Sequence, residues 1–365
     1  MIEIKGKFNT AIAFLNALEE TATKQITELC DQEFVKDSKI KIMPDAHAGA
    51  GCVIGTTMTI TDKVVPNLVG VDIGCGVHCV KLDIKEIDFE KLDKSIRKHI
   101  PSGFDVHKYE NKEFDLKELK CYSQFTGVQR LWCSLGTLGG GNHFIEIDKD
   151  SAGNLWLLVH SGSRNLGYQI AEIYQKKAYN TLKNKTAINK DLAYLEGQDF
   201  TDYLHDMNFI QKWAVRNREL MVNTILVGLR CSALEKIDTI HNYIDLDNMI
   251  LRKGAVSSQK DEMLVVPMNM RDGTLLCRGK GNPDWNYSAP HGAGRILSRT
   301  QAFKKLNLDE FKRTMEGIYT TTVMLKTLDE APMAYKPIEE ILEFVGDSLE
   351  VIDTMKPLYN FKAVE

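Results

Sequence analysis

Residues 69–78 have the sequence VGVDIGCGVH, and this glycine-rich stretch separates two β-branched runs that are expected to form strands. The runs are Cys52 to Ile60 and Val77 to Ile84, and the glycines between them indicate a loop. Glycines on both sides of Asp72 and Cys75 permit tight turns, so a carboxylate and a thiolate can converge on one point. The segment therefore predicts either a metal site or a glycine-rich turn around a small buried cysteine.

The rest of the sequence alternates between helical and extended patterns without a regular strand-helix-strand repeat. Apolar residues at helical spacing predict helices at Asn9 to Glu28, at Thr201 to Leu234 (one long helix or two abutting ones), at Gly294 to Phe303 and at Lys336 to Met355. Apolar runs predict strands at Met263 to Pro267 and, as a hairpin, at Phe144 to Ile147 and Leu155 to His160. This pattern favours an α+β or irregular α/β fold, with layers of sheet and helix in a single domain over residues 1–365.

The composition is that of an ordinary soluble globular protein, since 43% of the 365 residues are hydrophobic and 26% are charged. The 46 basic and 50 acidic residues give a net charge of −4, which argues against binding of nucleic acid by bulk electrostatics alone. No apolar run reaches the ~18 residues of a membrane span, and the first residues lack a secretory pattern, so we expect no membrane partner and a cytoplasmic location. The eight scattered cysteines are accordingly expected to be reduced.

A second glycine-rich cluster, LGTLGGGNHFIE, covers residues 135–146. Its three consecutive glycines permit close approach of the backbone to a phosphate, and Asn142, His143 and Glu146 supply an amide, an imidazole and a carboxylate. The cluster is not a Walker A loop, because no Gly-Lys-Ser/Thr follows, and it is not a dinucleotide-binding fingerprint, because a strand rather than a helix is expected to follow. A hairpin with a structural histidine is the alternative.

A third cluster, LVHSGSR at residues 158–164, brings His160 to the end of a predicted strand. Ser161 is not expected to be a nucleophile, because the Gly-x-Ser-x-Gly pattern is absent and adjacent strand residues point to opposite faces. Arg164 could bind phosphate with its bidentate guanidinium or form an ordinary surface ion pair. His78, on a predicted strand, is expected to be a core histidine.

His241, in the sequence IHNY, gains meaning only together with the other candidates. As a set they offer oxygen, sulfur and nitrogen ligands suited to Mn²⁺, Fe²⁺, Zn²⁺ or Co²⁺: Asp72, Cys75, His143, His160 and His241. A bridging thiolate could hold two such ions.

The last cluster, SAPHGAGRILSR at residues 288–299, has the composition of an anion-binding helix start. Gly292 and Gly294 are expected to lead into a helix whose N-terminal amides attract phosphate, with Arg295 and Arg299 one turn apart on one face. His291 could be a general base, a ligand or a nucleophile toward phosphorus. An ordinary helix start with a solvated histidine is the alternative.

Together these segments resemble the RtcB family of GTP-dependent RNA-splicing ligases. The resembling stretches follow the family's order: MPDAHAGAGCVIG (43–55), VGVDIGCGVH (69–78), LGTLGGGNHFIEI (135–147), VHSGSRNLGYQIA (159–171), HNY (241–243), RKGAVS (252–257), HGAGRILSRTQA (291–302) and PMAYK (332–336). Two stretches depart from the pattern. Pro290 precedes His291 where the commoner form has Ser or Cys, and residues 267–270 are Pro-Met-Asn-Met in place of Pro-Gly-Ser-Met.

The resemblance implies two Mn²⁺ ions that share Cys75 as a ligand. Asp72 and His143 would complete one site, and His160 and His241 the other. The resemblance also implies that His291 takes GMP from GTP. The implied guanylate pocket consists of Asn142, Phe144, Glu146, His291, Gly292, Ala293, Gly294, Arg295, Tyr335 and Lys362.

The implied activity joins RNA ends that carry a 2′,3′-cyclic phosphate or 3′-phosphate to 5′-hydroxyl ends, as in RNA repair or tRNA splicing. The expected partners are broken tRNA or rRNA fragments and, as a further implication, an archease-type activator. The departures, together with a chain shorter than is typical of the family, suggest a paralogue devoted to repair. Two rivals remain: a metal-dependent cyclic phosphodiesterase that does not ligate, and a non-catalytic protein that binds RNA or GTP.

Overall fold

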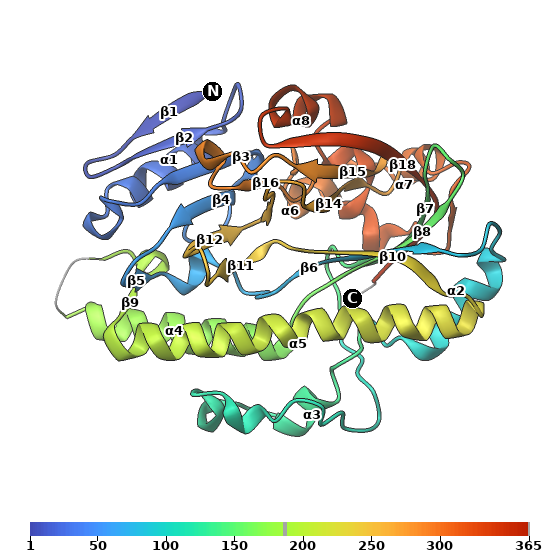
Figure 1. The fold of residues 1–365 in the computed structure, drawn as a ribbon, viewed down its shortest axis with the longest axis horizontal. Helices are drawn as coiled ribbons and strands as arrows, with labels where there is room; N and C mark the ends of the chain where they lie inside the picture. The colour runs from blue at the N-terminus through green and yellow to red at the C-terminus, as the bar shows by residue number, and fades with distance from the viewer. Residues whose placement is uncertain (185–187, 364–365) are drawn as a thin grey trace.

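The computed structural model describes residues 1–184 and 188–363, and two large sheets form its centre (Figure 1). In the six-stranded sheet the strands occur in the order β1 (Ile2–Lys5), β2 (Thr10–Ala13), β3 (Ile40–His47), β4 (Ile54–Thr59), β12 (Ile250–Lys253) and β11 (Asn242–Asp245). All neighbours in this sheet are antiparallel except β2 and β3.

The second sheet has eight strands and carries most of the site described below. Its order is β10 (Ala233–Ile240), β6 (Gly76–Leu82), β8 (Leu155–Ser161), β7 (Phe144–Lys149), β18 (Leu349–Lys362), β15 (Gly273–Gly279) and β14 (Met263–Asn269), and β17 (Tyr319–Thr320) pairs in parallel with β18. Two short ladders complete the strands: β13 (Ala255–Ser257) with β16 (Ser288–Pro290), and β5 (Lys63–Val64) with β9 (Leu195–Glu196).

One long helix, α5 (Gly197–Leu229), runs along the length of the molecule under the sheets, with α4 (Arg164–Leu182) beside it (Figure 1). Its buried face includes Met207, Ile210 and Trp213, which belong to the largest hydrophobic cluster. The other helices are α1 (Glu20–Cys30), α2 (Phe89–His99), α3 (Val128–Trp132), α6 (Arg299–Lys305), α7 (Leu308–Thr314) and α8 (Ile338–Val345). Single 3₁₀ turns or short 3₁₀ helices occur at Glu33–Val35, Pro66–Leu68, Leu116–Glu118, Tyr122–Gln124, Lys190–Leu192, Pro283–Trp285, Leu325–Glu330 and Pro332–Ala334.

The predicted α+β class is confirmed, and so is the hairpin of β7 and β8. The range Thr201 to Leu234 contains one helix, which ends at Leu229 because Arg230 adopts a left-handed conformation with φ of 55°. The assignment of a single domain stays a prediction. Within residues 1–184 and 188–363, no helix combines the length and the apolar character needed to cross a bilayer.

Three predicted helices have the wrong boundaries. Residues 10–13 form strand β2, which pairs with β3 and buries Ala11 and Ala13, so the first helix begins only at Glu20. The helix expected from Gly294 begins at Arg299 instead. Only Ile338–Val345 of the range 336–355 is helical, because β18 starts at Leu349 and pairs with β7 and β15, partners far away in sequence.

Candidate active site

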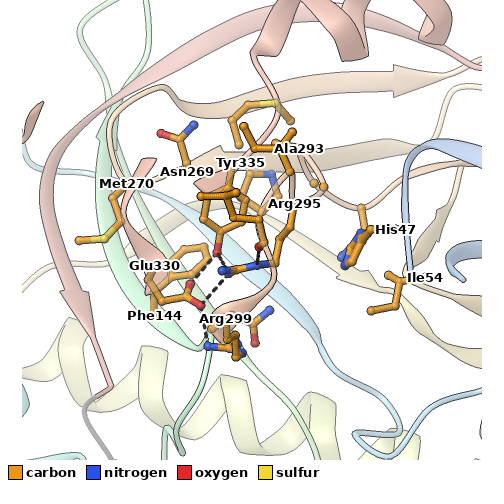
Figure 2. A pocket seen from close by; sticks show the side chains of 18 of the residues that line it. His47, Ile54, Phe144, Asn269, Met270, Ala293, Arg295, Arg299, Glu330 and Tyr335 are labelled. Atoms are coloured by element: carbon orange, nitrogen blue, oxygen red, sulfur yellow. Dashed lines mark hydrogen bonds and ion pairs between the residues drawn. The ribbon is translucent and has the colours of Figure 1, made fainter. Parts of the chain in front are cut away.

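One cavity of about 510 Å³ gathers residues from most of the sequence clusters. Two imidazoles of the predicted ligand set, His160 and His241, line it, and so does His291. The other predicted pocket residues all line the same cavity: Asn142, Phe144, Glu146, Gly292, Ala293, Gly294, Arg295, Tyr335 and Lys362. In Figure 2, Arg295, Arg299 and Tyr335 converge on Glu330, whereas His47 and Ile54 lie across the cavity from them.

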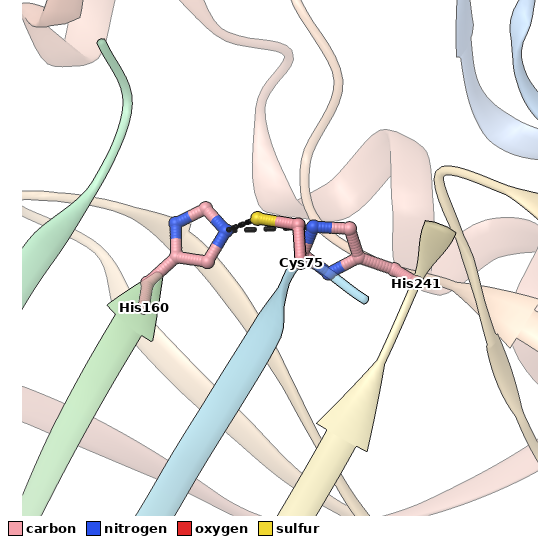
Figure 3. Close-up of side chains that lie close together, drawn as sticks. All are labelled: Cys75, His160 and His241. Atoms are coloured by element: carbon pink, nitrogen blue, oxygen red, sulfur yellow. Dashed lines mark hydrogen bonds between the residues drawn. The ribbon is translucent and has the colours of Figure 1, made fainter. Parts of the chain in front are cut away.

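Three predicted metal ligands, Cys75, His160 and His241, meet at the ends of three adjacent strands of the eight-stranded sheet (Figure 3). Strand β6 lies between β10 and β8, Cys75 precedes β6, His241 follows β10, and His160 lies near the end of β8. The Cys75 Sγ is 3.3 Å from the Nε2 of His160, which is 3.4 Å from the Nε2 of His241. Strand order, rather than sequence proximity, therefore builds this group.

The second group contains Asp72, Cys75 and His143. The His143 Nε2 lies 3.0 Å from the Asp72 Oδ2 and 3.5 Å from the Cys75 Sγ. Within each group the candidate ligand atoms all lie within 4.8 Å of one another. Cys75 belongs to both groups, so its sulfur is placed to bridge two ions.

Neighbouring groups orient these ligands. The Nδ1 of His143 lies 2.7 Å from the Leu138 carbonyl oxygen, and the Nδ1 of His160 lies 3.2 Å from that of Asn142. Because these carbonyls accept the Nδ1 protons, Nε2 is in both rings the nitrogen that faces the other candidate ligands and would coordinate a metal. Asp72 Oδ1 accepts hydrogen bonds from Ser163, and a Cβ on Gly162 would lie only 2.2 Å from that oxygen.

The electrostatics of the two groups fit a divalent cation. Burial lowers the pKa of His160 and of His241 well below the usual range, so both imidazoles are neutral. Burial alone would raise the pKa of Asp72, but the hydrogen bond from His143 outweighs it and keeps the carboxylate ionised. Burial and then Asp72 raise the pKa of the Cys75 thiol, whose proton a bound metal would displace. The donor set suits a borderline ion such as Mn²⁺ or Zn²⁺.

His291 is held by a carboxylate that sequence analysis did not single out. Its Nδ1 lies 2.6 Å from the Oδ2 of Asp45, which also accepts the backbone N–H of His291 at 3.1 Å. The rings of His291 and His241 have centroids 4.8 Å apart. Because Nδ1–H donates its hydrogen bond to Asp45, Nε2 is the ring nitrogen left at the boundary between the candidate metal ligands and the cavity. The histidine of the MPDAH stretch, His47, also lines the cavity.

The anion-binding helix start predicted at Gly292 and Gly294 is wrong. Gly294 has a φ of 73°, and a Cβ there would lie 2.3 Å from the Asp45 carbonyl oxygen, so the chain makes a tight turn against β3 before the helix begins. Arg295 and Arg299 consequently do not share a helix face. Instead, both guanidinium groups contact the carboxylate of Glu330.

Glu330 is the second residue that sequence analysis missed, and it connects the cationic side chains of the pocket. It is 2% exposed and accepts hydrogen bonds from the Tyr335 hydroxyl at 2.6 Å and the Lys362 Nζ at 3.1 Å. Burial alone would raise its pKa, but Lys362 and the two arginines lower it to about 2. The signal available from sequence was only an acidic residue near PMAYK, with no indication of its four partners.

Three other residues considered in the sequence analysis, His78, Arg164 and Ser161, make contacts that stabilise the fold and lie outside the candidate site. The Nδ1 of His78 pairs with Asp238 at 3.0 Å, as expected for a core histidine. The guanidinium of Arg164 donates to Gly103 O and Thr137 Oγ1 and does not line the cavity. Ser161 donates its hydroxyl proton to Leu138 O, which is not the environment of a nucleophile.

Asn269, from the stretch that departs from the family pattern, lines the cavity with an amide that is already engaged. Its Oδ1 accepts the backbone N–H groups of Arg271 and Asp272, and its Nδ2 donates to Asp272 Oδ2 at 2.8 Å. The loop is therefore held by its own hydrogen bonds. In this conformation the loop can contact a ligand in the cavity, but both polar atoms of the Asn269 side chain already make hydrogen bonds within the loop.

Comparisons with known proteins identify the family of the chain. The sequence matches the family described as "tRNA-splicing ligase RtcB" over residues 25–131 and 123–363. It is 31% identical to the "RNA-splicing ligase RtcB" of Escherichia coli K12 over an alignment of 385 positions that covers 93% of each chain. It is 25% identical to the "tRNA-splicing ligase RtcB" of Nanoarchaeum equitans, over 82% of this chain and 83% of that one. The family match spans most of the chain and includes every candidate ligand, and the chain therefore belongs to the RtcB family.

Proposed function

We propose that this chain is an RNA ligase that joins 2′,3′-cyclic phosphate or 3′-phosphate ends to 5′-hydroxyl ends, through a guanylylated His291 and with GTP and two Mn²⁺ ions. The observation that carries the proposal is the placement of His291. Its ring is fixed by Asp45, lies 4.8 Å from the ring of His241, and faces a cavity large enough for a nucleotide. Membership of a family whose relatives are named RNA-splicing ligases supports the same conclusion.

In the first step the Nε2 of His291 attacks the α-phosphorus of GTP. An N–P bond forms, the bond from the α-phosphorus to the bridging oxygen breaks, and pyrophosphate leaves. Asp45 keeps the Nδ1 proton in place and stabilises the positive charge that develops on the ring. Asn142, Arg295 and Lys362 line the cavity where phosphate and base would lie.

In the later steps GMP passes from His291 to the RNA 3′-phosphate, after water has opened any cyclic phosphate. The 5′-hydroxyl oxygen then attacks the 3′-phosphorus, forms the phosphodiester and releases GMP. Asp72, Cys75 and His143 would hold one Mn²⁺ ion, and Cys75, His160 and His241 the other. Two such ions, when bound, supply neutralisation of charge on phosphate oxygens during in-line displacement.

The proposed partners are broken RNAs such as tRNA or rRNA fragments, with an archease-type activator and a cytoplasmic location as further parts of the proposal. With a net charge of −4, the chain is expected to contact RNA through a local patch. Binding should then lose affinity with salt at a slope that corresponds to only a few phosphate contacts.

The experiment is to incubate the protein with α-labelled GTP and Mn²⁺ and to look for acid-labile label on the denatured chain. We expect label on the parent and none on His291→Ala or Cys75→Ala. His99→Ala and Cys231→Ala are matched controls outside the site and should label as the parent does.

A Mn²⁺-loaded parent that acquires no label would contradict the nucleotidyl transfer. If the same protein opens RNA 2′,3′-cyclic phosphates, the chain is the metal-dependent phosphodiesterase of the alternative interpretation. The engaged amide of Asn269 is the observation that favours this alternative, because it marks a base pocket that departs from the family pattern.

A further inference from the structure

A second buried carboxyl group lies behind Glu146 and has no part in the proposed steps. Asp148 follows two residues later on β7, and alternate residues of a strand share one face. Asp148 is 0% exposed and Glu146 is 3% exposed, but only Glu146 lines the cavity. The pair therefore has one member at the cavity wall and one in the interior.

The surroundings of Asp148 contain too few hydrogen-bond donors for an ionised carboxylate. Neither of its oxygens accepts a hydrogen bond from a donor within residues 1–184 and 188–363, and Thr274 Oγ1 and Asn360 Oδ1 are likewise without a partner there. The groups that interact electrostatically with Asp148 are Glu146 on its own strand, the thiol of Cys79 on β6 and the hydroxyl of Thr274 on β15. None of these is a cation, so the neutral acid is the form that the site accommodates.

The surroundings of Glu146 differ, because donors and a cation reach it from β18. Asn360 donates its Nδ2 protons to Glu146 Oε2, and Lys362 contributes positive charge from the same face of the strand. Burial raises the pKa of Glu146, and Asp148, Asn360 and Lys362 oppose that rise. Burial and then Glu146 raise the pKa of Asp148 well above its usual range. Of the two groups, Asp148 therefore keeps the proton and Glu146 the charge.

We propose that Asp148 is a positioning residue for the base-reading carboxylate: as a neutral acid it donates a hydrogen bond to Glu146 and keeps Glu146 ionised at the cavity wall. This inference rests on the proposed function, because it assigns Glu146 to the nucleobase. An ionised carboxylate accepts hydrogen bonds from two adjacent N–H groups of a purine, such as the ring N–H and the exocyclic amine of guanine. Protonated Glu146 would present a donor to that edge, so nucleotide affinity depends on one proton inside the sheet.

The first measurement is the affinity of the full-length protein for GMP, which binds without turnover, from mildly acidic to mildly alkaline pH. The parent should lose affinity as pH falls, because Glu146 takes up a proton. Asp148→Leu removes the donor, raises the pKa of Glu146 further and should move this loss to higher pH by about one unit or more. Asp148→Asn keeps a donor and should restore the midpoint of the parent.

The second measurement needs no nucleotide. An infrared spectrum of the parent at mildly alkaline pH, where Glu146 is ionised, should contain the carbonyl band of a protonated carboxyl group, which Asp148→Asn removes. Asp206→Asn is the matched control and should leave the band unchanged, because Asp206 is a buried carboxylate with four hydrogen-bond donors: Lys120 N, Cys121 N, Tyr174 OH and His205 Nδ1.

The outcomes of these measurements distinguish a failure of the inference about Asp148 from a failure of the proposed function. Absence of the band, or identical pH midpoints for Asp148→Leu and the parent, overturns the inference even if GMP binds and His291 is labelled. A band without GMP binding at any pH overturns the proposed function instead, and with it the assignment of this acid pair to base reading.

Discussion

Replacement of Asp45 by asparagine should slow guanylylation of His291 at least ~10-fold. The 2.6 Å contact joins Nδ1 to a carboxylate, and a hydrogen bond to a charged group contributes about 1.5–3 kcal/mol, or roughly 10- to 150-fold in rate. A second effect adds to this. An asparagine amide that turns its NH₂ toward Nδ1 makes that nitrogen an acceptor and moves the ring proton to Nε2, the atom that must attack. The opposite amide orientation buries the NH₂ at the position of Oδ1, which has no hydrogen-bonding partner among the described residues.

The assay is a single-turnover measurement with α-labelled GTP and Mn²⁺, in which the rate of acid-labile labelling is compared between the parent, Asp45→Asn and the control Asp206→Asn. Thermal unfolding of the three proteins establishes that the substitution leaves the fold intact. Labelling of Asp45→Asn within about threefold of the parent rate would refute the role given to Asp45, because even the lower estimate of the lost hydrogen bond predicts a tenfold effect.

Three further predictions concern the metal site and the cationic cluster. Cys75→Ser should reduce the content of both Mn²⁺ ions, measured by elemental analysis, because one sulfur serves both groups; selective loss of a single ion would contradict the shared ligand. Gly162→Ala should push Asp72 away and lower metal affinity while secondary structure by circular dichroism stays unchanged, and unaltered affinity would show that the loop absorbs the methyl group. Glu330 has a pKa of about 2 in the folded protein against an ordinary 4.5, so its stabilisation of roughly 3 kcal/mol is present above pH 4.5 and is lost as pH falls toward 2. Glu330→Gln should therefore lower the unfolding free energy at pH 7 and reduce its acid dependence, and an unchanged denaturant midpoint at pH 7 would argue against the network.

Four of the five candidate ligands follow a local pattern in the sequence, whereas His241 gains meaning only together with them. Asp72 and Cys75 lie in a glycine-rich turn, and His143 and His160 lie at strand ends, all of which a sequence displays directly. The pairing of β6 with both β8 and β10 is what brings Cys75 to His160 and His241, and no local pattern encodes that order. The sequence thus indicated which side chains could bind a metal, whereas long-range strand pairing decides that they meet.

The errors share one cause, which is the influence of distant partners on ambiguous segments. Residues 349–355 have apolar residues that fit a helix, but pairing with β15 and β7 makes them part of a 14-residue strand. That strand carries Asn360 and Lys362 to the cavity. Asp45 and Glu330 were missed because their roles depend on contacts across 246 and 32 residues, with His291 and Lys362 respectively.

The carbonyl oxygen of Asn142 lies 3.2 Å from the Nδ1 of His160 and also 3.2 Å from the Nζ of Lys362. One peptide group therefore contacts a candidate metal ligand on one side and a cation of the proposed nucleotide pocket on the other. A nucleotide that draws Lys362 away leaves this acceptor to the His160 N–H alone, which strengthens that hydrogen bond and makes the imidazole a better donor to a metal. Linkage then requires the converse, that loading of the metal site tightens nucleotide binding by the same factor. The order in which metal and nucleotide are added should alter the rates of assembly but not the final affinities.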